Sequence, residues 1–151
     1  MRSHSARGGF TIIELVMVLA LTSILASFAI IKVAPTLERS RVRRSAAMIA
    51  ADLQYAQMIA ARQRRPVVLI ANEALKGYMI RDAATTTVFR EAYMGDDTDM
   101  MLDQLEANPT TIEIFPNGVV RNAGTFTVRV NTSQRYIRIT RAGQVRITNA
   151  P

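Results

Sequence analysis

Residues 10–31 form an apolar run of 22 residues in which Glu14 is the only charged residue. As an α-helix rising about 1.5 Å per residue, this run would be roughly 33 Å long, enough to cross the ~30 Å hydrocarbon core of a bilayer. A secretory signal peptide is the competing interpretation, with residues 27–29 as its small-residue cleavage site. Its apolar region spans only about 7 to 15 residues. We therefore favour a transmembrane helix, and cleavage after Ala29 to release a soluble domain stays open.

The composition argues against catalysis. The chain has no cysteine, which excludes disulfides, thiolate zinc sites and thiol nucleophiles. The only histidine, His4, precedes the apolar run, so histidine-based acid–base chemistry and most transition-metal sites are also excluded. No glycine-rich phosphate loop opens a helix, and no pair of carboxylates stands in a recognisable catalytic setting. We predict that the protein is not an enzyme and has no catalytic residues, no cofactor and no bound metal.

Glu14 is the unusual residue of the apolar run. An isolated carboxylate at the centre of a membrane helix costs about 2.5 to 3.5 kcal/mol on insertion scales. Two explanations fit its place near the start of the run. The carboxylate lies close to the membrane interface and stays hydrated, or it pairs with a cation inside an assembly.

A second, amphipathic helix is expected to continue the first over residues 32–65. Pro35 interrupts the join, where a missing N–H predicts a kink or a melted turn. Pro66 and the extended stretch after it are expected to end the helix. Polar residues such as Asp52 and Gln57 fall outside the apolar stripe. That stripe recurs at steps of three and four residues and consists of Val42, Ala46, Ile49, Leu53, Ala56 and Ala60.

Residues 66–151 are predicted to form an antiparallel β domain of one or two sheets wrapped on the amphipathic helix. Apolar and polar residues alternate in its last three segments, as in half-buried antiparallel strands. Turn residues separate these segments at 116–118, 122–124 and 141–143. The fold class is therefore α+β. Strands are expected over residues 67–71, 78–81, 86–90, 111–115, 125–131, 136–140 and 144–148.

The sequence of residues 9–15, GFTIIEL, resembles the class III leader and first mature residues of type IV pilins and type II secretion pseudopilins. The resemblance implies that residues 1–9 are a leader peptide, which a prepilin peptidase cleaves between Gly9 and Phe10. It also implies N-methylation of Phe10. Glu14 then becomes the fifth mature residue, whose carboxylate is expected to meet the terminal amine of a neighbouring subunit during assembly.

The same resemblance implies the pilin lollipop fold, in which one long helix has a transmembrane half and an amphipathic half packed on the β domain. The implied partners are other pilin or pseudopilin subunits, the prepilin peptidase, an inner-membrane assembly platform and membrane lipid. The implied location is the bacterial inner membrane, with a single span and a periplasmic C-terminal domain, and after assembly the pseudopilus or pilus. The subunit is expected to polymerise through its N-terminal helix and to support protein secretion or pilus assembly.

More positive charges follow the apolar run than precede it, and this count contradicts the implied topology. The positive-inside rule would place the C-terminal side in the cytoplasm, but we follow the family because its leader motif is more specific. The basic cluster is typical of a solvated helix face or of a contact with lipid headgroups. Its members are Arg39, Arg41, Arg43 and Arg44, and Lys32 is the fifth positive charge counted for the topology.

A second resemblance, to the H-type minor pseudopilins (GspH) and the FimT-like minor pilins, rests on three separated groups of residues. It implies a low-abundance subunit near the filament tip. Residues 89–111 match nothing in these families and are expected to be a variable loop. The matching groups are Leu53, Ala56, Ala60, Arg64 and residues 66–67, then residues 114–118, then residues 137–145 with Gly143.

Acidic residues in the variable loop and a sequon after it are the remaining candidates for ligand or modification sites. Asp96, Asp97, Asp99 and Asp103 offer the carboxylate oxygens that calcium prefers, but their spacing fits no EF-hand loop. We favour a solvated acidic loop. The formal glycosylation sequon at Asn131 is expected to be unused in the bacterial context that the leader implies.

Arginines crowd the last strands and raise the alternative of a DNA-binding, FimT-like minor pilin for natural transformation. Arg138, Arg141 and Arg146 are the candidate phosphate contacts, within a chain whose formal charge is +7. FimT-like pilins carry a basic Gly-Arg-x-Arg motif, whereas residues 143–146 read Gly-Gln-Val-Arg and lack its first arginine. Tyr136 is the only aromatic residue nearby. We therefore favour a solvated basic face.

Overall fold

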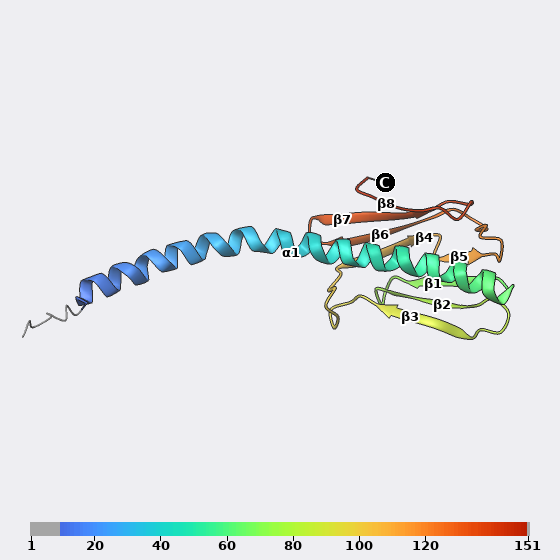
Figure 1. Cartoon of the computed structure of the whole chain (residues 1–151), viewed down its shortest axis with the longest axis horizontal. Helices are drawn as coiled ribbons and strands as arrows, with labels where there is room; N and C mark the ends of the chain where they lie inside the picture. Colours follow the sequence, from blue (N-terminus) through green and yellow to red (C-terminus); the bar gives the residue numbers. More distant parts are fainter. Residues whose placement is uncertain (1–9, 151) are drawn as a thin grey trace, which may run out of the picture. The chain divides into compact units, whose positions relative to one another are not determined.

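The computed structural model of the chain describes residues 10–150, and residues 28–34 by their backbone alone. Helix α1 (Ile12–Gln63) comes first, and the strands follow it (Figure 1). The chain divides into two compact units, Met1–Thr36 and Leu37–Pro151, so that α1 contributes to both. The helix is continuous through Pro35. Of the two alternatives expected at that residue, a kink or a melted turn, the melted turn is therefore absent from the described backbone.

Helix α1 ends in a specific C-terminal cap. Arg64, the residue after Gln63, has a φ of 54°, in the left-handed region. The N–H of Arg65 then donates to the carbonyl oxygen of Ala60 at 3.3 Å, which is the outer bond of a Schellman motif. Pro66 follows directly and cannot continue the helix. The predicted end of the amphipathic helix before Pro66 is confirmed.

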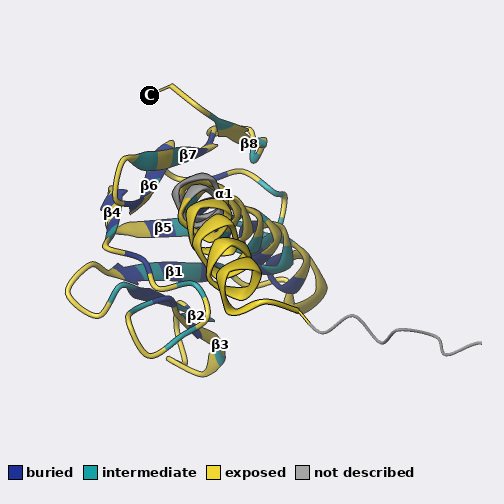
Figure 2. Cartoon of the chain, turned by 90° about the vertical axis from the view of Figure 1, so that its left-hand side faces the viewer, coloured by how far each residue is buried: buried dark blue, intermediate teal, exposed yellow. Residues whose placement is uncertain are grey.

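The β domain consists of two four-stranded antiparallel sheets, which resolves the choice between one sheet and two. The first sheet has the order β3-β2-β1-β5, and the second has the order β4-β6-β7-β8 (Figure 2). The strands of the first sheet are β1 (Val67–Asn72), β2 (Gly77–Asp82), β3 (Val88–Tyr93) and β5 (Thr111–Ile114). Those of the second are β4 (Gln104–Asn108), β6 (Gly124–Val130), β7 (Ser133–Ile139) and β8 (Val145–Thr148).

Strand β4 lies in a segment for which the sequence predicted a loop. Residues 89–111 were expected to be a variable loop, but β3 extends to Tyr93 and β4 pairs with β6 along its whole length. The inward side chains of β4, Leu105 and Ala107, are buried. In β4, buried apolar residues alternate with polar ones over only five residues. This alternation is too short to identify a strand without the pairing with β6. The remaining predicted strands are present with boundaries shifted by up to three residues.

The apolar stripe of α1 covers both sheets and forms the core with their inner faces. All six stripe residues are buried, as predicted. They contact a single cluster that includes Leu69 and Ile80 from the first sheet and Phe126 and Ile137 from the second. The helix and the antiparallel sheets therefore form an α+β fold, with the packed part of α1 lying within the second unit.

Candidate functional site

The start of α1 is a capping box built from Thr11 and Glu14. The backbone N–H and the hydroxyl of Thr11 both donate to Oε2 of Glu14 at 2.9 Å, and the Glu14 N–H donates back to Thr11 Oγ1 at 3.3 Å. This reciprocal pattern satisfies N–H groups that the first turn leaves free. Among the described residues, Oε1 of Glu14 accepts no hydrogen bond. The carboxylate therefore caps its own helix with one oxygen and keeps the other available.

The described helical residues of the first unit expose apolar side chains on every side. Residues 10–27 are all exposed, and Phe10 and Ile12 are 89% and 84% exposed. The hydroxyls inside this stretch bond to their own helix: Thr22, Ser23 and Ser27 each donate to a carbonyl oxygen one turn earlier, at 2.6 to 2.9 Å. Such a surface is typical of a helix that is buried against lipid or other helices.

The part of α1 with described side chains contains no window that combines the length and the hydropathy required to cross a bilayer. This finding does not support the predicted transmembrane span. The last four residues of that span, 28–31, lie outside the residues described by their side chains. The leader, including Gly9, lies wholly outside the described residues, so cleavage before Phe10 stays a prediction.

A buried polar cluster on the second unit was missed by sequence reasoning. Asp52, which falls outside the apolar stripe of α1, is only 4% exposed. Its Oδ2 accepts a hydrogen bond from Tyr78 Oη at 2.6 Å and one from Arg90 Nε at 2.8 Å. Burial, and next the hydrogen bond to Asp52, raise the pKa of Tyr78 above its ordinary value. The cluster fixes α1 against β2 and β3.

A second contact between α1 and the β domain involves Gly118 and Gly143, two glycines in the residue groups that resemble the H-type minor pseudopilins. Gln57 Nε2 donates to the carbonyl oxygen of Gly143 at 2.7 Å, linking α1 to the β7–β8 turn. Gly143 has a φ of +79°, and a Cβ there would overlap the carbonyl oxygen of Gly118. Gly118, in the turn after β5, has a φ of +80°. Both turns therefore favour glycine, Gly143 also because of the close approach of Gly118, and their contact closes the domain at this end of α1.

Two of the three candidate DNA-contact arginines are neighbours in the second sheet. Arg138 on β7 and Arg146 on β8 are register partners, and both are exposed. Arg141 is also exposed but lies in the turn between these strands. Like charges directly opposite one another destabilise a sheet slightly. No carboxylate among the described residues lies within 4.0 Å of any of these guanidinium groups.

The surroundings of Arg138 carry mixed charge. A cavity of about 450 Å³ on this outer sheet face is lined by Arg138 and Tyr136 but also by Glu73 and Glu106. Glu73 Oε1 accepts a hydrogen bond from the Ala107 N–H at 2.9 Å, which holds its carboxylate in place. Two carboxylates that line the same cavity as Arg138 oppose the binding of a polyanion there.

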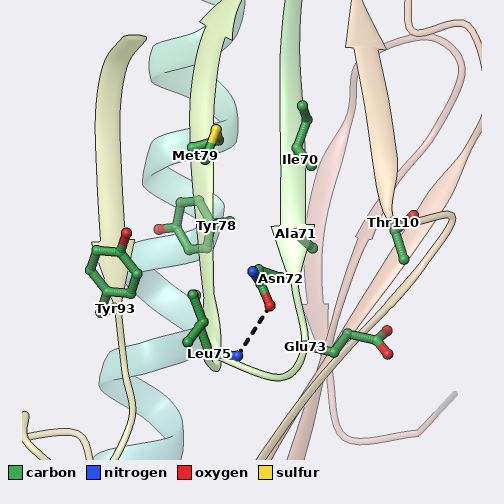
Figure 3. A pocket seen from close by; sticks show the side chains of 10 residues that line it. Ile70, Ala71, Asn72, Glu73, Leu75, Tyr78, Met79, Tyr93 and Thr110 are labelled. Carbon is green, nitrogen blue, oxygen red and sulfur yellow. Dashed lines mark hydrogen bonds between the residues drawn. The ribbon is translucent and has the colours of Figure 1, made fainter.

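A mostly apolar hollow of about 300 Å³ lies on the outer face of the first sheet, at the β1–β2 hairpin, and Figure 3 shows the side chains that line it. Ile70 and Met79 are register partners there, and Tyr93 of β3 flanks them. In the hairpin turn, Asn72 Oδ1 accepts a hydrogen bond from the Leu75 N–H at 3.1 Å. These groups give the hollow an apolar floor and a structural turn at its rim.

The acidic loop and the sequon are engaged in structural contacts. Asp96 forms an ion pair with Lys76 at 3.0 Å, and Asp103 accepts a hydrogen bond from the Asn131 N–H. Within residues 10–150, no cluster of three or more acidic, histidine or cysteine residues could hold a metal. Asn131 Nδ2, the atom that glycosylation would modify, donates to Glu38 Oε1 at 2.7 Å.

Comparisons with known proteins agree with this architecture. Residues 45–143, more than half of the chain, match the family model for type II transport protein GspH, and residues 4–30 match the prokaryotic N-terminal methylation motif. A search of curated protein sequences gave no match.

Two crystal structures of the type IV minor pilin FimU from Pseudomonas aeruginosa are similar in fold. One is 25% identical, with a TM-score of 0.58 over 75% of this chain and 90% of that chain. The other is 22% identical, with a TM-score of 0.57 over 70% of this chain and 91% of that chain.

Proposed function

Because the chain belongs to the GspH family of type II transport proteins, we propose that its N-terminal helix first anchors it in the bacterial inner membrane and then joins it to other subunits of a filament. The protein is a pilin-like subunit of a type II secretion system or a type IV pilus. In our proposal it is a minor, non-enzymatic subunit that supports protein secretion or pilus assembly.

Processing precedes assembly in this proposal. A prepilin peptidase cleaves between Gly9 and Phe10, and the new amino terminus on Phe10 is methylated. The N-terminal methylation motif over residues 4–30 supports both steps. Cleavage removes Arg2 and Arg7, and it leaves a terminal amine one residue before the capping box. The assembly platform then extracts the mature subunit from the membrane.

The exposed apolar surface of residues 10–27 supports both the anchor and the filament contact. Apolar surface of this extent is unstable in water and favours burial in lipid or against neighbouring helices. Because Thr22, Ser23 and Ser27 bond to their own backbone, burying them leaves no hydroxyl donor unsatisfied.

The observation that carries the proposal is that the two carboxylate oxygens of Glu14 have different roles. Its Oε2 completes the capping box with Thr11, while Oε1 has no partner among the described residues. A carboxylate in apolar surroundings requires compensation. The terminal amine of a neighbouring subunit supplies it, and the resulting charge pair in a low dielectric selects both the neighbour and the register.

The test distinguishes two roles of Glu14: its negative charge and its hydrogen bonds in the capping box. Glu14→Gln keeps a side chain that serves the third position of a capping box but removes the charge. Thr11→Ala removes the cap and keeps the carboxylate. We expect Glu14→Gln to accumulate in the membrane but to be lost from sheared filaments, and Thr11→Ala to enter filaments. Immunoblotting of membrane and filament fractions measures both, and normal incorporation of Glu14→Gln would refute the role of its charge.

A second candidate function, DNA binding during natural transformation, is favoured by one observation, the cross-strand pair of Arg138 and Arg146. Unpaired arginines on one sheet face attract phosphates without sequence preference. If this function holds, the double variant Arg138→Gln/Arg146→Gln should weaken DNA retention and flatten its dependence on salt, whereas Arg62→Gln should not. The absence of salt-dependent DNA retention by the wild-type chain would reject it.

A further inference from the structure

A shallow groove on the second unit joins the amphipathic part of α1 to the far end of the β domain. Its volume is about 190 Å³. Next to the groove, Asn131 Nδ2 in the β6–β7 turn donates a hydrogen bond to Glu38 of α1 and holds the turn against the helix. The groove therefore draws on three separate segments of the chain. Its lining consists of Arg39 and Val42 of α1, Ser133, Gln134 and Arg135 of β7, and Asn149 after β8.

The two arginines of the groove have no acidic partner. Among the described residues, no carboxylate lies within 4.0 Å of Arg39 or Arg135, and neither guanidinium donates a hydrogen bond. Glu38, which precedes Arg39 in the sequence, accepts from the Asn131 side chain, and Asp103 accepts from the Asn131 N–H. Both positive charges are thus left to act on a ligand from outside the chain.

The lining is matched to a phosphate. Arginine presents a planar fork of N–H donors that fits phosphate oxygens in a bidentate manner. Ser133, Gln134 and Asn149 add a hydroxyl and two amides that can donate to the same oxygens. Val42 also lines the groove but is only 1% exposed, so the surface that meets a ligand consists chiefly of the charged and polar groups.

We propose that this groove binds the headgroup phosphate of an anionic phospholipid, such as phosphatidylglycerol, while the subunit is still in the membrane. The inference rests on the membrane anchor of the proposed function. Arg39 follows the end of the predicted span, residue 31, by eight residues, or about 12 Å of helical rise. An extended arginine covers part of that distance, and the headgroup layer covers the rest. The lipid holds the domain at the membrane surface until assembly releases it.

The test uses the full chain purified in a neutral nonionic detergent and short-chain phosphatidylglycerol as the probe. Calorimetric titration is expected to give saturable binding of phosphatidylglycerol and much weaker binding of short-chain phosphatidylcholine. Arg39→Gln and Arg135→Gln should each weaken binding about tenfold, as the loss of a charge-assisted hydrogen bond predicts. Arg43→Gln is the matched control, because Arg43 is an exposed arginine one turn further along α1 that does not line the groove.

Four outcomes would overturn the inference. An equal loss with Arg43→Gln would mean that diffuse charge binds the lipid. Inorganic phosphate binding as tightly as the lipid, through the same arginines, would mean a free-anion site. Phosphatidylcholine binding as tightly as phosphatidylglycerol would mean no selection for anionic lipid, and displacement of the lipid by a short oligonucleotide would assign the groove to nucleic acid. Carbonate extraction of membranes tests the anchor separately, so that failure of the anchor is distinguishable from failure of the groove.

Discussion

Tyr78 on β2 donates a hydrogen bond of 2.6 Å to the carboxylate of Asp52, a residue of α1 that lies 26 positions earlier in the chain. Arg90 of β3 donates to the same oxygen at 2.8 Å, so one carboxylate gathers a helix and two strands. Asp52 is buried, whereas the Arg90 side chain is 43% exposed. The ion pair is therefore partly screened, and the buried hydrogen bond from Tyr78 is the more sensitive contact.

Removing the carboxylate should destabilise the domain. Asp52→Ala leaves the Tyr78 hydroxyl buried without an acceptor and is expected to lower the free energy of unfolding by about 2 to 4 kcal/mol. Tyr78→Phe removes one hydrogen bond and is expected to cost about 1 to 2 kcal/mol. Urea unfolding of the full chain in nonionic detergent, followed by near-ultraviolet circular dichroism, measures both. Asp97→Ala, in the exposed acidic loop, is the control, and a loss as large as that of Asp52→Ala would contradict the prediction.

The same contact predicts an alkaline titration. Burial and the hydrogen bond to Asp52 raise the pKa of Tyr78. Since the folded-state pKa exceeds the unfolded value of about 10, the neutral phenol contributes stability that is complete below that pH and lost as pH rises further. The folded chain should therefore release this proton only as it unfolds in alkali. Tyrosinate difference absorbance is expected to show this late step in the wild type and not in Tyr78→Phe.

Local periodicity explains which parts of the fold were predictable. The stripe from Val42 to Ala60 was recognisable because a helix repeats every 3.6 residues, and all its members are buried. The burial of Asp52 was not predictable, because it depends on Tyr78 and Arg90, which lie 26 and 38 residues away in the chain. Contacts across such distances leave no local pattern.

The candidate sites were likewise predictable where they lie within one local pattern, and not where they join distant segments. Arg138 and Arg146 lie in strands that alternate clearly, so the sequence placed both on strands, and the register then made them partners. The groove between Arg39 and Arg135 joins α1 to β7, and the sequence contains no signal for that pairing. Glu14 was singled out as a lone charge, but its capping bonds with Thr11 emerged only from the geometry of the first turn.

Gly143 should tolerate no side chain. Its φ of +79° is costly for other residues, and an added Cβ would also overlap the carbonyl oxygen of Gly118. Gly143→Ala is therefore expected to lower the free energy of unfolding by about 2 to 4 kcal/mol. Gly118→Ala is a matched control, because its φ of +80° is the same but nothing lies within 4 Å of the added Cβ. It should cost about 1 kcal/mol. Equal losses in urea unfolding would show that the close contact contributes nothing.

Asp82, at the end of β2, should make the stability of the domain depend on acid. Its Oδ1 accepts hydrogen bonds from the N–H groups of Thr85 and Ala84, at 2.8 and 2.7 Å, and these bonds lower the pKa of the carboxyl below its ordinary value. Because the folded-state pKa is depressed, the stability that the carboxylate adds is present in full above the unfolded pKa of about 3.9 and is lost as pH falls through the folded value.

Asp82→Asn tests this dependence, because asparagine keeps an acceptor for both N–H groups but carries no charge. The wild-type chain should be more stable than Asp82→Asn near neutral pH, and the difference should shrink as the pH falls below about 4. Urea unfolding at a series of pH values measures this difference. Asp97→Asn, which removes a carboxylate from the exposed loop, should show no such convergence. A gap between wild type and Asp82→Asn that stays constant with pH would mean that the two N–H donors do not stabilise the charged form.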